Sequence, residues 1–466
     1  MPFKGSSGTT GADAGIYNWS DFAASSNPNL DTYNFTGDDR PLRTATKVVA
    51  ASDASQSFID MSDYQCDGTA DDVQIQQAID ALPSGGGRIM LTEGTFTLGA
   101  QITLPAAPVR LEGQGQGSTI VTCKNSFNTD MFLVGASDDQ GTVLGSIGHM
   151  TIDGNSGNQT SGSGIRQQSG NRFTISRCYI TNCKEHGIYI EGVDGSFRSD
   201  YTIVHACWVH ANLKHGIFVE NPSNDPHIAD SWISDNGVNT STYDNIAFSN
   251  IADFSVVGNN IWQGKRHNLS IDRGGPGQII SNTFNTAQES NIAMLTSIGG
   301  VQISGNTFHE ASARTSGTYP HIVINGTSGQ NSIVGNWFSN VNETVSDNIT
   351  EEGSANQQII AFNNIDPNSN SKTMTVIGAD TKVFGNREYV TENSGTATLA
   401  NGNTSIVVSH GLSVTPAAGD IMITPIEAWG SMTEFYIDTY TSTQFTIHSD
   451  QDPGQDVDFA WKAIVL

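Results

Sequence analysis

The stretch KEHGIYIEG, residues 184–192, returns twice further along the chain, as LKHGIFVEN at 213–221 and as KRHNLSIDRG at 265–274. Each copy joins a basic residue and a histidine to a segment in which aliphatic residues alternate with other side chains. Alternation with period two indicates a β-strand rather than a helix. A strand motif that returns at intervals of this size is typical of a solenoid.

The rest of the chain supports this interpretation. Seven segments share the strand pattern and begin at residues 163, 186, 215, 244, 267, 290 and 320, at intervals of 23 to 30 residues. A second column has a small polar residue or asparagine, followed two positions later by an aliphatic or aromatic residue. Its members are Cys178, Cys207, Ser231, Asn259, Asn282, Asn306, Asn336 and Asn363. Stacked amides can bond from rung to rung only when the strands are parallel and in register. We therefore predict a parallel β-helix over roughly residues 90–385.

The segment before the repeats predicts a short capping helix. Asp71 or Asp72 can cap a helix that carries apolar residues from Val73 to Leu82, and the PSGGG stretch at 83–87 ends it. RIMLTEGTF at 88–96 then begins the strand pairing. A helix in this place would cover the open end of the solenoid.

The same segment carries a family resemblance. The series DGTADD, IQQAIDAL, GGGRIML and LEGQGQGSTI, within residues 67–120, resembles the N-terminal cap of the pectate-lyase-like right-handed β-helix superfamily. That superfamily includes polysaccharide lyases, polygalacturonase-like hydrolases and phage tailspike depolymerases. The resemblance covers about residues 60–385 and implies an all-β fold, a right-handed parallel β-helix with a small N-terminal capping helix. Active sites lie in different places within the superfamily, so it assigns no catalytic residue here.

Three domains are predicted. Residues 1–55 are rich in Ser, Gly, Asn and Asp and are expected to form an extended arm, and residues 56–388 form the β-helix with its cap. Residues 389–466 have short alternating strands separated by turns, which is typical of a β-sandwich. This last segment resembles the C-terminal sandwich of phage tail fibres and tailspikes, where such modules trimerise the chain or bind sugar. The resemblance thus implies a homotrimer.

Composition narrows the classes of partner. The chain has 21 Lys and Arg against 47 Asp and Glu, a formal net charge of −26, which argues against a nucleic-acid binder. The five Cys form no disulfide framework or metal motif, and the first residues show no signal peptide. No apolar run is long enough for a membrane span. We expect folding in the cytoplasm, a place on the virion tail or outside the cell after release, and no cofactor.

The repeats also predict a functional face. In the opening stretch, Ile188 and Ile190 point inward, so Tyr189 and Glu191 point outward. Stacked rungs would then gather carboxylates, histidines, cations and aromatics on one outer face. The predicted catalytic residues are Glu191, Glu220 and Asp272. The predicted substrate-binding residues are His186, Tyr189, Lys214, His215, Phe218, Arg266, His267 and Arg273. No metal site is predicted, since Asp244 interrupts the histidine column.

Two of the carboxylates suit the hydrolysis of a glycosidic bond. Glu220 and Asp272 would lie two rungs apart, ~10 Å at the backbone, close to the ~6.5–9.5 Å between the carboxyl groups of inverting hydrolases. Ser249 between them would leave room for water. Glu191, one rung from Glu220, would tune the pair or bind sugar. The leading hypothesis is a tailspike-type polysaccharide depolymerase that hydrolyses a cell-surface or extracellular glycan.

Two other functions remain open. A polysaccharide lyase would use Lys214, Lys265 or Arg266 as a base toward a uronic-acid polymer, with Ca²⁺ held by the carboxylates. A glycan-binding fibre or adhesin would bind sugar without cutting it.

Structural roles are alternatives for each cluster. The acidic column can be a solvated face, the histidines can stack or cap turns, and Tyr189 and Phe218 can pack beneath a loop. Trp208, Trp232 and Trp337 form another cluster, either a sugar platform or a subunit interface. In a trimer, the interface is the favoured use.

Overall fold

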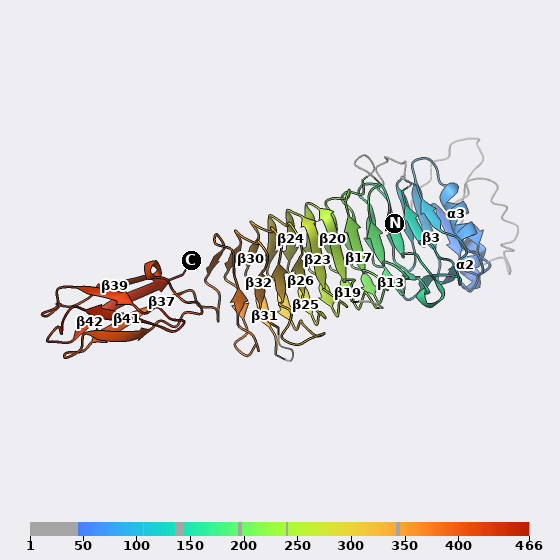
Figure 1. Cartoon of the computed structure of the whole chain (residues 1–466). Helices are drawn as coiled ribbons and strands as arrows, with labels where there is room; N and C mark the ends of the chain where they lie inside the picture. The colour runs from blue at the N-terminus through green and yellow to red at the C-terminus, as the bar shows by residue number, and fades with distance from the viewer. Residues whose placement is uncertain are drawn as a thin grey trace, which may run out of the picture. The chain divides into compact units, whose positions relative to one another are not determined.

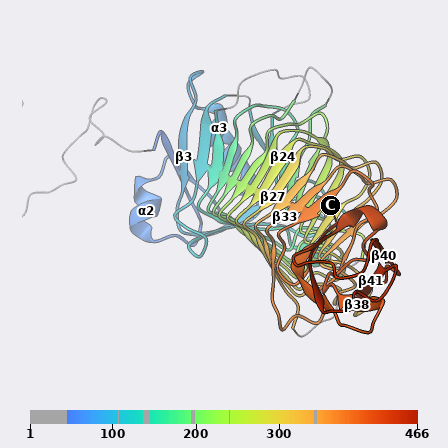
Figure 2. The ribbon, with the colours of Figure 1, turned by 90° about the vertical axis from the view of Figure 1, so that its left-hand side faces the viewer.

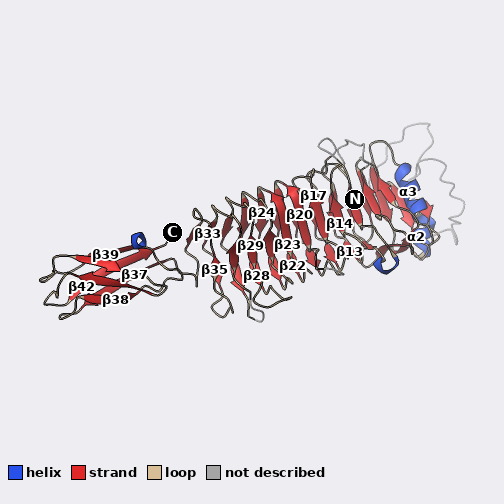
Figure 3. Ribbon diagram, viewed as in Figure 1, coloured by secondary structure: helices blue, strands red, loops and turns tan. Residues whose placement is uncertain are grey.

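The computed structural model describes residues 45–105, 107–135, 144–193, 198–238, 241–341 and 345–465. Within these residues the chain winds through three parallel sheets in turn, and from β3 onward each strand of the solenoid pairs with the strand three positions further along, as far as the last rung (Figures 1 and 3). Successive turns of the chain therefore stack as rungs. The predicted parallel β-helix is confirmed.

In the described part of the chain, sheet 1 has 14 strands and sheets 2 and 3 have 11 each. Sheet 1, seen across its strands in Figure 2, contains β1 (Lys47–Ala50), β2 (Tyr64–Gln65), β3 (Gly87–Leu91), β6 (Val109–Glu112), β9 (Ser146–Gly148), β12 (Thr174–Ser176), β15 (Ile203–His205), β18 (His227–Ala229), β21 (Phe254–Val257), β24 (Gly277–Ile280), β27 (Val301–Ser304), β30 (Ser332–Val334), β33 (Ile359–Ala361) and β36 (Lys382–Phe384).

Sheet 2 contains β4 (Gly94–Leu98), β7 (Thr119–Cys123), β10 (Thr151–Asp153), β13 (Tyr179–Thr181), β16 (Trp208–His210), β19 (Trp232–Ser234), β22 (Asn260–Trp262), β25 (Thr283–Asn285), β28 (Thr307–His309), β31 (Trp337–Ser339) and β34 (Asn364–Ile365). Sheet 3 contains β5 (Ile102–Leu104), β8 (Phe132–Val134), β11 (Ile165–Gln167), β14 (Ile188–Ile190), β17 (Ile217–Glu220), β20 (Ile246–Ile251), β23 (Leu269–Gly274), β26 (Ile292–Met294), β29 (Ile322–Ile324), β32 (Ile349–Glu351) and β35 (Met374–Thr375).

The core runs through the middle of the three sheets. Ile188 and Ile190 are fully buried, as predicted, and their register partners on the next rung are the equally buried Ile217 and Val219. Because strand alternation sends every second side chain inward, each rung adds one apolar layer. These layers form one continuous hydrophobic cluster through the solenoid.

A ladder of buried asparagines links the rungs, as predicted. The side-chain amide of each asparagine donates to the side-chain oxygen of the next at 2.9–3.0 Å and to a main-chain carbonyl at 2.8–3.0 Å. Its members are Asn259, Asn282, Asn306, Asn336, Asn363 and Asn386. The buried amides within this ladder thus keep their hydrogen-bond partners.

A second asparagine ladder was not predicted. It runs through Asn212, Asn236, Asn245, Asn268 and Asn291, with amide-to-amide distances of 2.7–2.9 Å. Its members sit in the turns between sheets 2 and 3. Asn236 and Asn245 belong to the same turn, so this ladder has no constant spacing in the sequence.

The capping helix is α3, Asp72–Asp80, and it packs on strands of all three sheets at the N-terminal end of the solenoid. Ile75, Ala78 and Ile79 are buried as predicted, but Val73 is 46% exposed. The Asp71 carboxylate accepts hydrogen bonds from the main-chain N–H groups of Gly68 and Thr97. It therefore ties the helix to β4 instead of capping the helix itself.

The predicted boundary at residue 56 is too late, because β1 already pairs in parallel with β2 and β3. A further short helix, α2 (Gln56–Met61), follows β1 and was not predicted. Most of the predicted arm, residues 1–44, lies outside the described residues. No helix of the described residues has the length and apolar character needed to cross a membrane.

The C-terminal segment has two three-stranded antiparallel sheets, as expected for a small β-sandwich. One pairs β37 (Glu392–Leu399), β42 (Val457–Ile464) and β39 (Ile421–Pro425), and the other pairs β38 (Ser405–Ser409), β41 (Gln444–Ser449) and β40 (Phe435–Asp438). These strands have a hydrophobic core of their own, with Leu399, Phe445 and Phe459 at its centre.

The asparagine ladder predicts a large effect of a single amide. Replacing Asn306 by alanine removes the donor to Asn336 and Ile279 and leaves the buried side chain of Asn282 without its acceptor. Each orphaned buried group costs about 1–3 kcal/mol, so Asn306→Ala should lower the melting temperature clearly. Asn368→Ala, at an exposed turn, is the matched control and should leave it unchanged. Equal melting temperatures for the two variants would show that the ladder contributes nothing.

Candidate functional site

The outer face of sheet 3 carries the predicted acidic column. Glu220, Ser249 and Asp272 are direct register partners on β17, β20 and β23. Glu220 and Asp272 are thus two strands apart, with only the small Ser249 between them. The predicted relative placement of these three residues is confirmed.

Glu191 is held by arginine. It follows β14, is 9% exposed, and accepts from Nε of Arg166 at 2.8 Å, with a second guanidinium nitrogen 2.6 Å from the same oxygen. Arg166 also reaches the carboxylate of Asp130 at 3.4 Å. This contact from two guanidinium nitrogens holds the Glu191 carboxylate in place, which suits a positioning role.

Tyr189 connects the two glutamates. Its hydroxyl donates to Glu220, and burial together with hydrogen bonding to Glu220 and Glu191 raises the pKa of Tyr189. The tyrosine therefore stays protonated and acts as a donor to the carboxylates. The ring stacks on Phe218 at 5.4 Å, and the Arg166 guanidinium lies 5.3 Å from its centre.

The histidine column is buried, contrary to the predicted exposed position. His186 and His215 are stacked 5.4 Å apart at an interplanar angle of 5°, and they are 8% and 9% exposed. Phe218 lies 5.1 Å from His215, and Tyr243 meets His215 edge-on at 5.0 Å. Tyr243 comes from the turn between β19 and β20. The alternative in which the histidines stack from rung to rung therefore describes His186 and His215 better than direct sugar binding.

Arg266 is part of a buried ion pair. Its Nε and one terminal guanidinium nitrogen donate to the two oxygens of Asp244, which is fully buried. Asp244 also accepts from the main-chain N–H of His267 at 2.9 Å and the hydroxyl of Ser270 at 2.7 Å. Burial opposes the charge of Asp244, but the bond with Arg266 together with the charges of Arg266, His267 and His215 outweighs it and lowers the pKa of this carboxyl. The predicted substrate-binding role of Arg266 conflicts with this geometry, because its guanidinium already has its partner.

The other predicted cations differ in whether they have an ion-pair partner. Lys214 pairs with Glu185 at 2.5 Å, and Lys265 pairs with Asp235 at 2.9 Å. Arg273 follows Asp272 on β23 with a left-handed φ of 64° and has no ion-pair partner within the described residues. Of the predicted binding cations, Arg273 is thus the one best placed to meet an added ligand.

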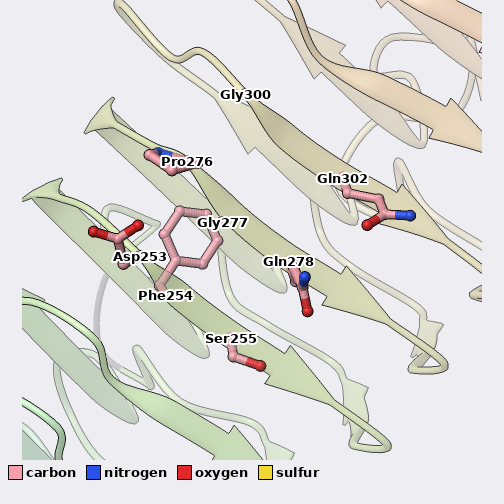
Figure 4. A pocket seen from close by; sticks show the side chains of 8 residues that line it. All are labelled: Asp253, Phe254, Ser255, Pro276, Gly277, Gln278, Gly300 and Gln302. Atoms are coloured by element: carbon pink, nitrogen blue, oxygen red, sulfur yellow. The ribbon is translucent and has the colours of Figure 1, made fainter.

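Sequence reasoning missed a groove on sheet 1. It has a volume of about 390 Å³, and Figure 4 shows the eight residues that line it across β21, β24 and β27. Gln278 and Gln302 are register partners, and Asp253 and Pro276 lie at its edge. Glycine is required at 277, since an added Cβ would lie 2.3 Å from the ring of Phe254.

The groove shares two rungs with the acidic column, those of Ser249 and Asp272. The chain passes from Ser249 to Asp253, and from Asp272 to Pro276, in the turn between sheets 3 and 1. The charge of Asp253 also acts on a neighbouring carboxyl group: burial, followed by the charges of Asp253 and Asp200, raises the pKa of Asp225. The sequence contains a signal for this group of three carboxylates, because an aspartate stands shortly before the sheet 1 strand on three successive rungs, at positions 200, 225 and 253.

Metal binding receives no support from the described side chains, which include no cluster of three or more His, Cys, Asp and Glu suited to an ion. Asp244 separates His215 from His267 along the column, and its carboxylate is engaged by Arg266.

Comparisons with known proteins agree with this architecture. Residues 109–252 match the sequence model of a family described as "Right handed beta helix region". The solenoid is a right-handed β-helix. No curated protein matches the sequence.

Solved structures share the right-handed β-helix at low identity. The A-module of the mannuronan C-5 epimerase AlgE4 from Azotobacter vinelandii is 17% identical, with a TM-score of 0.56 over 68% of this chain and 97% of that one. ORF18 of Geobacillus virus E2 is 16% identical, with a TM-score of 0.54 over 82% and 74%. Tailspike protein 2 of an Escherichia coli O157:H7 bacteriophage is 14% identical, with a TM-score of 0.51 over 80% and 56%. At these identities the likeness establishes the fold alone.

The buried histidines predict a pH-dependent stability. Burial lowers the pKa of His215 and of His267 to about 4, from an ordinary value of 6.5. Between those values the unfolded chain binds protons that the folded chain does not, so stability falls as the pH is lowered from 6.5 to 4. A pKa difference of this size corresponds to roughly 3 kcal/mol per histidine.

Melting temperatures measured from pH 7 to pH 4 test this. His215→Gln and His267→Gln should each make the decline shallower, whereas His227→Gln, on the outer face of β18, should leave the slope unchanged. Identical slopes in all variants would show that the buried rings do not cause the decline.

Proposed function

We propose that this protein is a glycan depolymerase of tailspike type that hydrolyses glycosidic bonds. The observation that carries the proposal is the outer column of sheet 3, in which Glu220 and Asp272 are two strands apart across Ser249. Strands lie ~4.8 Å apart, so two strands span ~10 Å at the backbone. Tyr189, one rung before Glu220, and Thr296, one rung after Asp272, hold the two side chains on opposite sides, so the carboxyl groups must turn toward each other to reach the ~6.5–9.5 Å that an inverting pair needs.

In this mechanism one carboxyl group protonates the leaving oxygen while the other removes a proton from the attacking water. The water is placed over Ser249, between the two carboxylates. Without substrate, the hydroxyl of Tyr189 donates to Glu220 and the hydroxyl of Thr296 donates to Asp272, and both bonds are released when the carboxyl groups turn toward the bound sugar. Glu191 acts on the pair through Tyr189 and is a positioning residue.

The neighbouring groove supplies a place for the sugar. Its amide groups, from Gln278 and Gln302, can donate to and accept from hydroxyls, while Pro276 offers an apolar edge. Because the groove shares the rungs of Ser249 and Asp272, we propose that a glycan bound there extends around the turn toward the two carboxylates.

The structural neighbours support a glycan as the ligand. One is described as a mannuronan epimerase and another as a tailspike protein. By analogy with the second, we further propose a homotrimer on a virion tail. No cofactor is part of the proposed mechanism.

β-Elimination is the less favoured alternative. Each predicted lyase base is engaged in an ion pair: Lys214 with Glu185, Lys265 with Asp235 and Arg266 with Asp244. A base must be free to take the proton of the sugar, and none of the three is.

Replacing either carboxylate should abolish cleavage. Glu220→Gln and Asp272→Asn keep the size of the side chain and remove its charge, and general acid–base catalysis contributes about 10²–10⁴-fold. We expect a loss of at least about 100-fold in the release of reducing ends from a polysaccharide. Glu352→Gln, an exposed residue after β32 of the same sheet, is the control. Full activity in both site variants would exclude this pair.

The products distinguish the proposed reaction from its alternatives. Reducing ends should rise without ultraviolet absorbance, the first product should have inverted anomeric configuration, and a chelator should have no effect. Proton nuclear magnetic resonance during the first minutes of reaction reads the configuration. Absorbance that rises together with reducing ends would establish a lyase, and retained configuration would rule out the Glu220–Asp272 mechanism.

A further inference from the structure

Sheet 2 carries a column of aromatic side chains on its outer face. Tyr179, Trp208 and Trp232 are direct register partners on β13, β16 and β19, and Trp262 lies on the next strand. Their ring centres are 4.7, 6.1 and 6.3 Å apart in sequence order. We call these four residues the tryptophan stripe. It lies on a different sheet from the acidic column.

The indole rings of the stripe do not stack on one another. Trp232 meets Trp208 at an interplanar angle of 78° and Trp262 at 72°. Trp232 is 55% exposed, so its ring offers free aromatic surface to solvent. A ring in this position can receive the apolar face of a sugar, which packs on an aromatic ring as other apolar surfaces do.

A hollow beside the stripe adds polar groups. It has a volume of about 200 Å³ and is lined by Trp208 and Trp232 together with Gln116, Asp230 and two small residues. The Asp230 carboxylate lies 3.2 Å from Nε2 of His205, and both side chains are accessible. An aromatic wall with a few convergent hydrogen-bonding groups is the usual composition of a small-ligand site.

These features favour a sugar over a second subunit as the occupant. The core of a subunit interface is depleted in charged residues, whereas Asp230 stands in the hollow beside the most exposed indole. The sequence favoured the interface because the family resemblance implies a trimer.

The charge of the hollow selects among sugars. Among the described residues that line the hollow, Asp230 carries a carboxylate and none is a lysine or arginine. The exposed Arg177 is not one of the lining residues. A polymer of uronic acids would bring its own carboxylates against Asp230. A neutral sugar would instead place hydroxyls against Asp230, His205 and Gln116.

We propose that the tryptophan stripe and its hollow bind a neutral glycan chain, as a holding site separate from the cleavage site on sheet 3. The proposal deepens the proposed function, on which it rests, by assigning the class of glycan and a second point of contact. A holding site keeps a long polymer on the protein between cuts, so its loss should affect polymers more than short oligosaccharides.

The experiment compares two tryptophans of one column. Full-length protein is run through gels that contain a neutral polysaccharide such as dextran, starch or galactomannan, or polygalacturonate, and retardation gives the affinity. Trp232→Ala should weaken retention by a neutral polymer at least tenfold. Trp337→Ala is the matched control, because Trp337 occupies the same outer column with Thr307 and Asn364 as neighbours, and retention should not change.

Three results would overturn the proposal. The first is equal retention of Trp232→Ala and Trp337→Ala by a neutral polymer. The second is a wild-type protein that is retained only by polygalacturonate or by no polymer. The third is a lower molar mass of Trp232→Ala in light scattering, which would make the stripe a subunit interface. Circular dichroism confirms that both variants fold.

The experiment distinguishes failure of the holding site from failure of the proposed depolymerase activity. Retention that depends on Trp232 without any release of reducing ends would leave the holding site and remove the depolymerase. Cleavage of a neutral polymer with retention unaffected by Trp232→Ala would do the reverse.

Discussion

The buried amide ladders are the constraint on which the rest of this structure depends. A side-chain amide inside the solenoid must find both a donor and an acceptor, because no water reaches it. Asn306 satisfies both needs only when Asn282 and Asn336 lie directly on either side of it, one rung away. A slip of one residue would break every such bond and turn the apolar layers outward. The ladders therefore fix the register, while the hydrophobic core supplies most of the stability.

A fixed register turns the sequence repeat into surface chemistry. Residues at equal places in the repeat become neighbours, so Glu220, Ser249 and Asp272 form one column and Tyr179, Trp208 and Trp232 form another. The chain thus brings carboxylates to one sheet and aromatic rings to a second. A long polymer suits such a surface, because successive sugars and successive rungs both repeat along one direction.

The buried carboxylate of Asp244 and the surface carboxylates of the acidic column have different kinds of partner. Asp244 takes the place of a histidine in the column, and its full burial draws in Arg266, Ser270 and the main chain of His267. Such a pair needs all of its partners, since an unpaired buried carboxylate is strongly destabilising. Arg266 consequently serves the fold. The acidic column stays at the surface, where Tyr189 and Thr296 each hold one carboxylate and leave its other oxygen free of these two bonds.

The sequence by itself determined the β-helix, the asparagine ladder, the capping helix, the C-terminal strands and the order of residues in each column. These follow from period-two alternation and from spacing, which are local properties of the chain. Only the tertiary structure decided which column members are accessible. His186 and His215 are buried because Tyr243 folds back on them from a turn, and Val73 is exposed because α3 packs through its other face. The groove over Gln278 and Gln302 and the hollow beside Trp232 likewise arise between rungs, from side-chain sizes on neighbouring strands. Turn conformation and packing between rungs set these features, and neither is encoded in the repeat.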